Sequence, residues 1–435
     1  MSQNTVKELF SFIEQSPTCF HAVDTMEKAL KKEGYEQLYE GEKWQLMSGG
    51  KYYAIRGGAS LIAFRMPSKE AVGFQIMSSH SDSPMFKIKQ NPEIDVEGHY
   101  VKLNVEKYGG LINGAWFDRP LSIAGRLVVK TETGVKSVLL DAKRDLCMIP
   151  NLAIHLDHDR NKGYTYENQK DMLPIYAEKG TTGDFLKDMA GYAKVSDSDV
   201  LDYDLFVYNN MAGSIWGANK EFLSAPRLDD LECAFASLQA FLRAAEGESI
   251  PMHCVFDNEE VGSRSMRGAA STFMVNVIQR ICQSLSSDAT LCQRMLANSF
   301  MISADNAHAL HPNYVQKYCP TNHVFMNEGI VIKYSANQKY TTDAISASVF
   351  KRLCEITDVP CQMFVNHADV AGGSTLGNIS QSQVSLPTVD IGLAQLAMHS
   401  PYETAGIRDV DYLIRVAKHF YEHSIIAAEG EYLIK

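Results

Sequence analysis

Short apolar runs alternate with amphipathic stretches through the C-terminal half of the chain, and this alternation constrains the fold more than any other feature. The apolar runs predict buried strands, and they are Met252–Phe256, Phe300–Ala304, Gly329–Lys333, Cys361–Val365 and Ser385–Ile391. Helical periodicity occupies about 231–245, 271–297 and 342–356, and a closing helix follows from about Asp409. Alternating strands and helices predict an α/β fold with a mixed, largely parallel central sheet and helices on both faces.

A second region, between about Lys89 and Asn219, interrupts this pattern. Strand-like runs recur there at 101–105, 121–129 and 138–140, separated by turns that contain glycine, and few helical stretches lie between them. The first 88 residues carry helical and then strand-like patterns that we expect to join the central sheet. We therefore predict a discontinuous catalytic domain formed by 1–88 and 220–435, and an inserted β-rich domain formed by 89–219.

Composition excludes several classes of partner. The 435 residues include 41 Lys and Arg against 52 Asp and Glu, a net charge of −11. No basic cluster of the kind that binds nucleic acid is present, and no apolar stretch approaches the about 18 residues that span a bilayer. The N-terminus lacks the apolar core of a signal peptide, and the nine cysteines are scattered without CxxC pairs, which is typical of reduced thiols. We predict a soluble, cytoplasmic protein with neither nucleic acid nor membrane as a partner.

Acidic and histidine side chains follow the predicted strands. They are His80 and Asp82 after the run at 72–77, Glu259 and Glu260 after Phe256, Asp305 after Ala304, and His399 after the run at 385–391, while Asp229 precedes a helix. Because the carboxyl ends of parallel strands meet at one edge of a sheet, we expect these side chains to converge. Taken singly, each has a structural alternative as a turn former, a helix cap or a solvated surface residue.

A cluster of this composition suits metal ions. Carboxylates at contact distance raise one another's pKa unless cations neutralise them. Two histidines with three carboxylates suit a pair of Zn²⁺ ions, or Co²⁺ or Mn²⁺, and two ions bridged by one carboxylate activate a water as a nucleophile. In the adjacent pair Glu259 and Glu260, one side chain can bind metal while the other accepts the proton of that water.

Five segments resemble the aspartyl aminopeptidase family of metallopeptidases and occur in the family's order. They are SHSDSP at 79–84, SAPRLDD at 224–230, DNEEVGS at 257–263, SADNAHALHPNY at 303–314 and QLAMHS at 395–400. The resemblance implies a zinc-peptidase-like catalytic domain, with the β-rich insert serving dimerisation. The implied activity is removal of the N-terminal residue from peptides, with a preference for Asp or Glu, by a protein that assembles as dimers and further as dodecamers.

The resemblance also implies roles for individual residues. Two divalent metal ions, most simply zinc, would be held by His80 and Asp305, by Glu260 and His399, and by Asp229 as the bridge. Glu259 would be the general base, and Asp82 would orient His80.

Three further residues have implied roles in substrate recognition. Lys333 matches the family's basic residue for an acidic substrate side chain, and His308 would line the site. His155 would enter the site of the partner subunit and stabilise the oxyanion, although it can also be read as a structural histidine at the end of an apolar strand.

Three other functions stay open. A broad-specificity aminopeptidase or an amidohydrolase of acylated amino acids could use the same two-metal site. A non-catalytic assembly protein that has kept the fold is the alternative from another class, although the complete set of candidate ligands argues against it.

Overall fold

The computed structural model describes residues 2–178, 180, 183–428 and 430–435, and its largest sheet has nine strands in the order β1-β2-β3-β13-β4-β14-β18-β16-β17. Their bounds are β1 Glu36–Gln37, β2 Lys51–Arg56, β3 Ser60–Arg65, β4 Phe74–His80, β13 Ile250–Phe256, β14 Phe300–Ala304, β16 Ile330–Tyr334, β17 Cys361–Val365 and β18 Thr388–Gly392. The four central strands β13, β4, β14 and β18 run parallel, whereas β2, β3 and β16 introduce antiparallel pairs. The predicted mixed, largely parallel sheet is confirmed.

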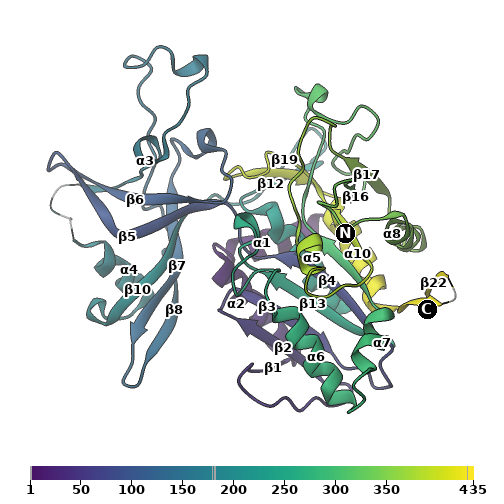
Figure 1. Cartoon of the computed structure of the whole chain (residues 1–435). Coiled ribbons are helices and arrows are strands. Elements are labelled where there is room, and N and C mark those ends of the chain that lie inside the picture. The colour runs from purple at the N-terminus through teal and green to yellow at the C-terminus, as the bar shows by residue number, and fades with distance from the viewer. Residues whose placement is uncertain (1, 179, 181–182, 429) are drawn as a thin grey trace.

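Helices cover both faces of this sheet (Figure 1). One face carries α1 Ser2–Glu14, α2 Cys19–Lys32, α5 Leu228–Arg243, α8 Ala344–Ile356 and α10 Asp409–Glu422, and the other carries α6 Phe273–Leu285, α7 Leu291–Ala297 and α9 Leu376–Ser380. Successive strand residues alternate between the two faces, so that Met77 packs against the first group and Ile76 against the second. Both faces of the central strands are therefore buried.

The helix predicted over 271–297 is wrong as a single element, because α6 and α7 are separate helices. Between them, the Asp288 side chain accepts hydrogen bonds from the backbone N–H and the hydroxyl of Thr290. Short polar side chains of this kind compete with the helical hydrogen-bond ladder, and they break the apolar periodicity that suggested one continuous helix.

A separate six-stranded antiparallel sheet has the order β8-β7-β10-β5-β6-β9, and Figure 1 shows it beside the larger sheet. Its strands are β5 Met85–Val96, β6 Tyr100–Tyr108, β7 Leu121–Lys130, β8 Val135–Asp141, β9 Ile175–Glu178 and β10 Val200–Asn209, accompanied by the helices α3 Asn168–Asp171 and α4 Phe185–Ala193. This sheet has its own apolar cluster around Phe86 and Trp116. Because β5 begins at Met85, the sheet starts a few residues before the expected boundary, and the division into domains stays a prediction.

A five-stranded sheet lies in the order β11-β12-β20-β19-β15. Its strands are β11 Ser214–Trp216, β12 Phe222–Ala225, β15 Ala307–His308, β19 Ala394–Leu396 and β20 Glu403–Gly406, and a further pair, β21 Ile425–Ala428 and β22 Glu431–Ile434, follows α10. In the small sheet, β19, which follows β18 in the chain, pairs with β15 and β20. Within the described part of the chain, every helix is too short or too polar to cross a bilayer.

Candidate metal centre

Five of the residues predicted to bind metal meet at the carboxyl edge of the central sheet. His80 is the last residue of β4, Asp305 follows β14, and Glu260 lies in the short 3-10 turn after β13. Asp229 stands at the start of α5, where the backbone is not yet helical. His399 comes after the strand at 385–391, as expected, and lies in a turn between β19 and β20.

The ligand atoms of these five side chains face one another at distances that suit shared cations. Nε2 of His80 lies 3.4 Å from Oδ1 of Asp229 and 3.9 Å from Oδ1 of Asp305. Nε2 of His399 lies 3.6 Å from Oδ2 of Asp229 and 3.3 Å from Oε2 of Glu260. Two atoms bound tetrahedrally at ~2.0–2.1 Å to one ion are about 3.3 Å apart. The two oxygens of Asp229 each face a different histidine, which is the arrangement of a bridging carboxylate.

The charge balance of the cluster also fits cations. Burial disfavours the charged ring of His399, yet contact with Asp229 and the nearby Glu260 raises its pKa to about 10. Burial of Glu260 raises its pKa well above its usual value. Oδ1 of Asp229 and Oε1 of Glu260 are buried without a hydrogen-bond partner among the described residues. Buried anions without partners are costly, so this donor set of imidazoles and carboxylates fits divalent metal ions.

Asp82 connects His80 to the turn that carries the two glutamates. Its backbone carbonyl lies 3.0 Å from Nδ1 of His80 and its Oδ1 lies 3.5 Å from the same atom. The carboxylate also accepts the backbone N–H groups of Glu259 and Glu260, at 3.1 and 3.2 Å. A group that accepts the second ring N–H of a ligating histidine fixes the tautomer and the orientation of its ring.

Glu259 faces a cavity of about 170 Å³ at this edge. The cavity is lined by Asp229, Glu259, Glu260, Asp305, Asn306, Ala307, His308, Lys333, Tyr340, Phe364, Gly373, Ser374, Thr375, Met398 and His399. Burial raises the pKa of Glu259 to about 8, with a further contribution from nearby Asp305. A carboxylate that faces this cavity is placed to exchange protons with a molecule bound there.

Lys333 and His308 lie in the same cavity. Lys333 is 3% exposed, its Nζ donates to the backbone carbonyl of Asn306 at 2.8 Å, and it lies 3.4 Å from Oδ2 of Asp305. Burial disfavours its charge, but the neighbouring Asp305 raises the pKa of the ammonium above its usual value. A positive charge is therefore held at the wall of the cavity.

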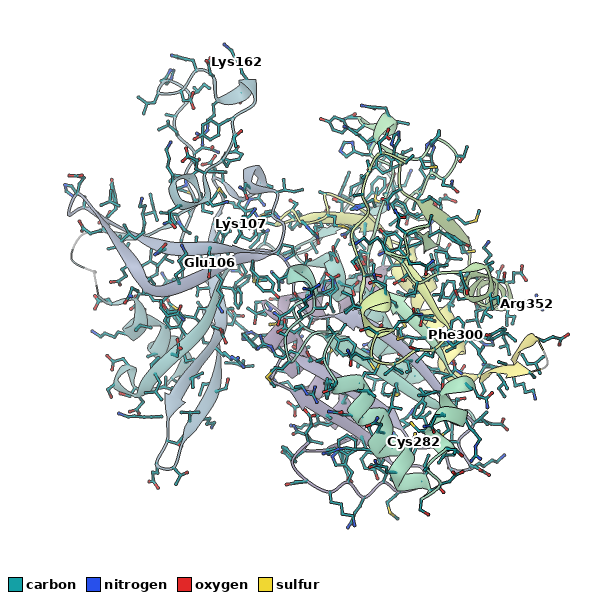
Figure 2. The ribbon with its side chains drawn as sticks, in the orientation of Figure 1. Glu106, Lys107, Lys162, Cys282, Phe300 and Arg352 are labelled. Atoms are coloured by element: carbon teal, nitrogen blue, oxygen red, sulfur yellow. The ribbon has the colours of Figure 1, made fainter. Side chains whose placement is uncertain are left out.

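His155 does not line the cavity of its own chain. It lies in an exposed turn, so the alternative position at the end of an apolar strand is wrong. The turn belongs to a segment between β8 and α3 that projects from the six-stranded sheet, and Figure 2 shows Lys162 near its tip, far from the core residue Phe300.

Asp230 and Glu403 contact residues of the site and were given no role from the sequence. Asp230 is fully buried, accepts the N–H of His80 through Oδ2, and groups with Asp229 and Asp305 in a second set of possible metal ligands. Glu403 accepts the backbone N–H groups of Asp229 and His399, at 3.0 and 2.7 Å. The position of Asp230 beside Asp229 was a usable signal, whereas nothing in the local sequence marks Glu403.

Comparison with known proteins shows the family to which this chain belongs. Residues 12–421 match the family described as "Aminopeptidase I zinc metalloprotease (M18)". The relative named "Probable M18 family aminopeptidase 2" from Clostridium novyi (strain NT) is 44% identical over 422 residues, which cover 95% of this chain and 98% of that protein.

Two solved structures extend the likeness. A chain in the structure of the Ape4 and Nbr1 complex has a TM-score of 0.94 at 33% identity, and the match covers 97% of this chain and 86% of that one. The mApe1 dodecamer from S. cerevisiae has a TM-score of 0.85 at 28% identity, with 96% of each chain covered. The chain therefore belongs to the M18 family of zinc metalloproteases and is a metallo-aminopeptidase.

Proposed function

We propose that this aminopeptidase works with two zinc ions held at the candidate metal centre. His80 and Asp305 would hold one ion, Glu260 and His399 the other, and Asp229 would bridge them. The single observation that carries the proposal is the position of Asp229, whose two oxygens lie 3.4 Å from one imidazole and 3.6 Å from the other. Cobalt or manganese would fit the same nitrogen and oxygen donors.

Glu259 is the proposed general base. Two such ions, when bound, supply a water of lowered pKa and polarise the scissile carbonyl group. The Glu259 carboxylate accepts the proton of that water and returns it to the leaving amine. Its neighbour Glu260 points its carboxylate at His399 instead, so the two adjacent glutamates divide proton transfer and metal binding between them.

The proposed substrates are peptides with a free N-terminus and, by preference, an acidic first residue. The support is Lys333, whose ammonium lines the cavity that also holds Glu259. His308 lines the same wall and is proposed to contact the peptide. A substrate carboxylate would find there a cation that burial has shielded from water, and electrostatic attraction is stronger in such surroundings.

Self-association through the six-stranded sheet completes the proposal. The projecting segment exposes Leu152, Ile154 and Leu156 around His155, and an apolar patch of this kind is typical of a protein interface. One relative in the comparison is a dodecamer. We propose dimers that assemble further, with His155 of the partner subunit stabilising the oxyanion. All nine cysteines are free, which supports a reducing, cytoplasmic location.

The Glu259→Gln variant tests the assignment of the base. The amide cannot accept a proton, so we expect turnover to fall at least about a hundredfold. The zinc content should stay near that of the wild type, because Glu259 is not among the proposed ligands. Turnover at the wild-type rate would show that Glu259 is not the base.

A substrate panel separates the remaining functions. Aspartyl-, glutamyl-, leucyl- and lysyl-anilides should be cleaved, the acidic pair fastest, and their N-acetylated counterparts should resist. Equal rates on the four anilides would favour a broad-specificity aminopeptidase, and cleavage of the acetylated set alone would favour an amidohydrolase. Failure to cleave either set with metal bound would favour a non-catalytic assembly protein.

A further inference from the structure

A segment from the six-stranded sheet contacts two residues of the candidate metal centre, Glu260 and His399. Strand β6 ends at Tyr108, and Figure 2 shows Glu106 and Lys107 where this strand approaches the rest of the molecule. A Cβ atom on Gly109 would lie 3.2 Å from Cβ of Glu260, and one on Gly110 would lie 3.4 Å from Nδ1 of His399. Ile112 donates its N–H to the carbonyl oxygen of His399 at 3.2 Å. The segment 108–112 therefore touches residues proposed to bind metal.

The hydroxyl group of Tyr108 forms the most direct of these connections. It donates a 2.6 Å hydrogen bond to Oδ2 of Asp82 and accepts one of 2.8 Å from Nδ2 of Asn258. Asn258 is the residue that precedes the glutamate pair and has a left-handed backbone, with φ of 61°. The Tyr108 ring packs edge-on against Phe206 of β10, with ring centroids 5.8 Å apart. The hydroxyl is thus anchored to the six-stranded sheet while both of its partners belong to the site.

Asp82 connects Tyr108 to the metal centre. Its Oδ2 accepts from the hydroxyl group of Tyr108 and from the N–H of Glu260, and its Oδ1 accepts from the N–H of Glu259. The same carboxylate lies 3.5 Å from Nδ1 of His80. A short hydrogen bond from an O–H group to a carboxylate is charge-assisted and roughly twice as strong as a neutral one. Without it, the carboxylate would have one fewer restraint on its rotation beside His80.

We propose that Tyr108 is a positioning residue: its hydroxyl fixes Asp82 and thereby holds His80 and the Glu259–Glu260 turn in the geometry that binds metal. The inference rests on the proposed two-metal function. Besides self-association, the six-stranded sheet then has a second role, which is to support the metal centre of its own chain. A purely structural role for Tyr108 would require only its ring, which Phe206 contacts, and not its hydroxyl.

The test is the Tyr108→Phe variant, which keeps the ring and removes only the hydroxyl. Loss of a group that orients a metal ligand typically costs about 10–100-fold in metal affinity or activity. We expect zinc release from the loaded variant into a coloured chelator to be about tenfold faster or more, with kcat reduced and KM little changed, because Tyr108 is not among the residues that line the cavity.

Tyr203→Phe is the matched control. Its hydroxyl donates a 2.6 Å hydrogen bond to the carbonyl oxygen of Lys89 within the six-stranded sheet, so the control loses a similar bond that does not reach the site. It should release zinc at the wild-type rate. Equal zinc release from the Tyr108 and Tyr203 variants, both of which retain the fold by thermal unfolding, would overturn the inference.

A double variant locates the effect. If Tyr108 acts through Asp82, adding Tyr108→Phe to Asp82→Asn should cause no further loss, whereas independent effects would multiply. Zinc release needs no turnover, so it tests the inference separately from the reaction.

The two failures are distinguishable. If the wild-type protein binds zinc but cleaves no peptide, the proposed function is overturned and the inference about Tyr108 is not. If the losses in the double variant multiply, the role of Tyr108 through Asp82 is overturned and the proposed function is not.

Discussion

Lys333 illustrates how a single buried charge can set substrate preference. Its ammonium is held in the cavity wall by the carbonyl group of Asn306 and by Asp305. Replacing Lys333 by glutamine should lower the ratio of kcat/KM for aspartyl-anilide to kcat/KM for leucyl-anilide about tenfold or more, because a hydrogen bond to a charged group contributes about 1.5–3 kcal/mol. The ratio is measured because general damage to the site affects both substrates alike.

Lys339→Gln is the control for that comparison. Lys339 is an exposed lysine in the loop after β16, and its replacement should leave the ratio unchanged. A Lys333→Gln variant with the wild-type ratio would contradict the proposed contact between Lys333 and an acidic first residue.

The site could be predicted from the sequence wherever its residues follow a recognisable strand. His80 closely follows the apolar run at 72–77 and Asp305 directly follows the run that ends at Ala304, and the rule that parallel strands present their carboxyl ends together was sufficient to expect them at one edge. Tyr108 and Glu403 could not be predicted in this way. They reach the site through another sheet and through backbone hydrogen bonds, and such contacts leave no pattern in the local sequence.

Helix α5 buries an acidic side chain that makes stability depend on pH. Glu232 is fully buried. One of its oxygens accepts a 3.1 Å hydrogen bond from Asn306, and within the part of the chain that the structure describes the other has no hydrogen-bond partner. Burial raises its pKa from 4.5 to about 8. The folded state therefore binds this proton more tightly than the unfolded state does, and the contribution of Glu232 to stability is lost as pH rises towards 8.

The Glu232→Gln variant tests this pH dependence of stability directly. The variant carries no titrating group at position 232. The free energy of unfolding of the variant minus that of the wild type should therefore increase from pH 6 to pH 8, by at most about 1.4 kcal/mol per pH unit. Urea unfolding of the metal-free proteins at the two pH values measures the difference. An identical difference at both values would contradict the effect of burial.

Elements with long, regular apolar patterns were predicted well, and the shortest ones were not. The central strands and most helices lie where periodicity placed them. The five-stranded sheet was missed because strands such as β15, Ala307–His308, and β19, Ala394–Leu396, are too short to produce an alternating pattern. The break between α6 and α7 depends on side-chain hydrogen bonds to the backbone, which periodicity does not register.

The arrangement of the whole molecule bears on how sites are shared between subunits. His155 lies on the projecting segment and outside the cavity of its own chain. If it serves the partner subunit, inactive Glu259→Gln and His155→Ala proteins should complement each other when they assemble together. A mixed dimer then has one complete site, so random mixing should restore up to about a quarter of wild-type activity. No recovery in mixed dimers confirmed by mass would contradict sharing of His155.

The measurement that tests the central claim most directly is a zinc titration of the metal-stripped protein, followed by hydrolysis of aspartyl-anilide. Two ions bridged by Asp229 predict that the stripped protein is inactive and that full activity returns only at two equivalents of zinc per chain. Full activity at one equivalent would contradict the two-metal centre, and activity without any metal would contradict the account as a whole.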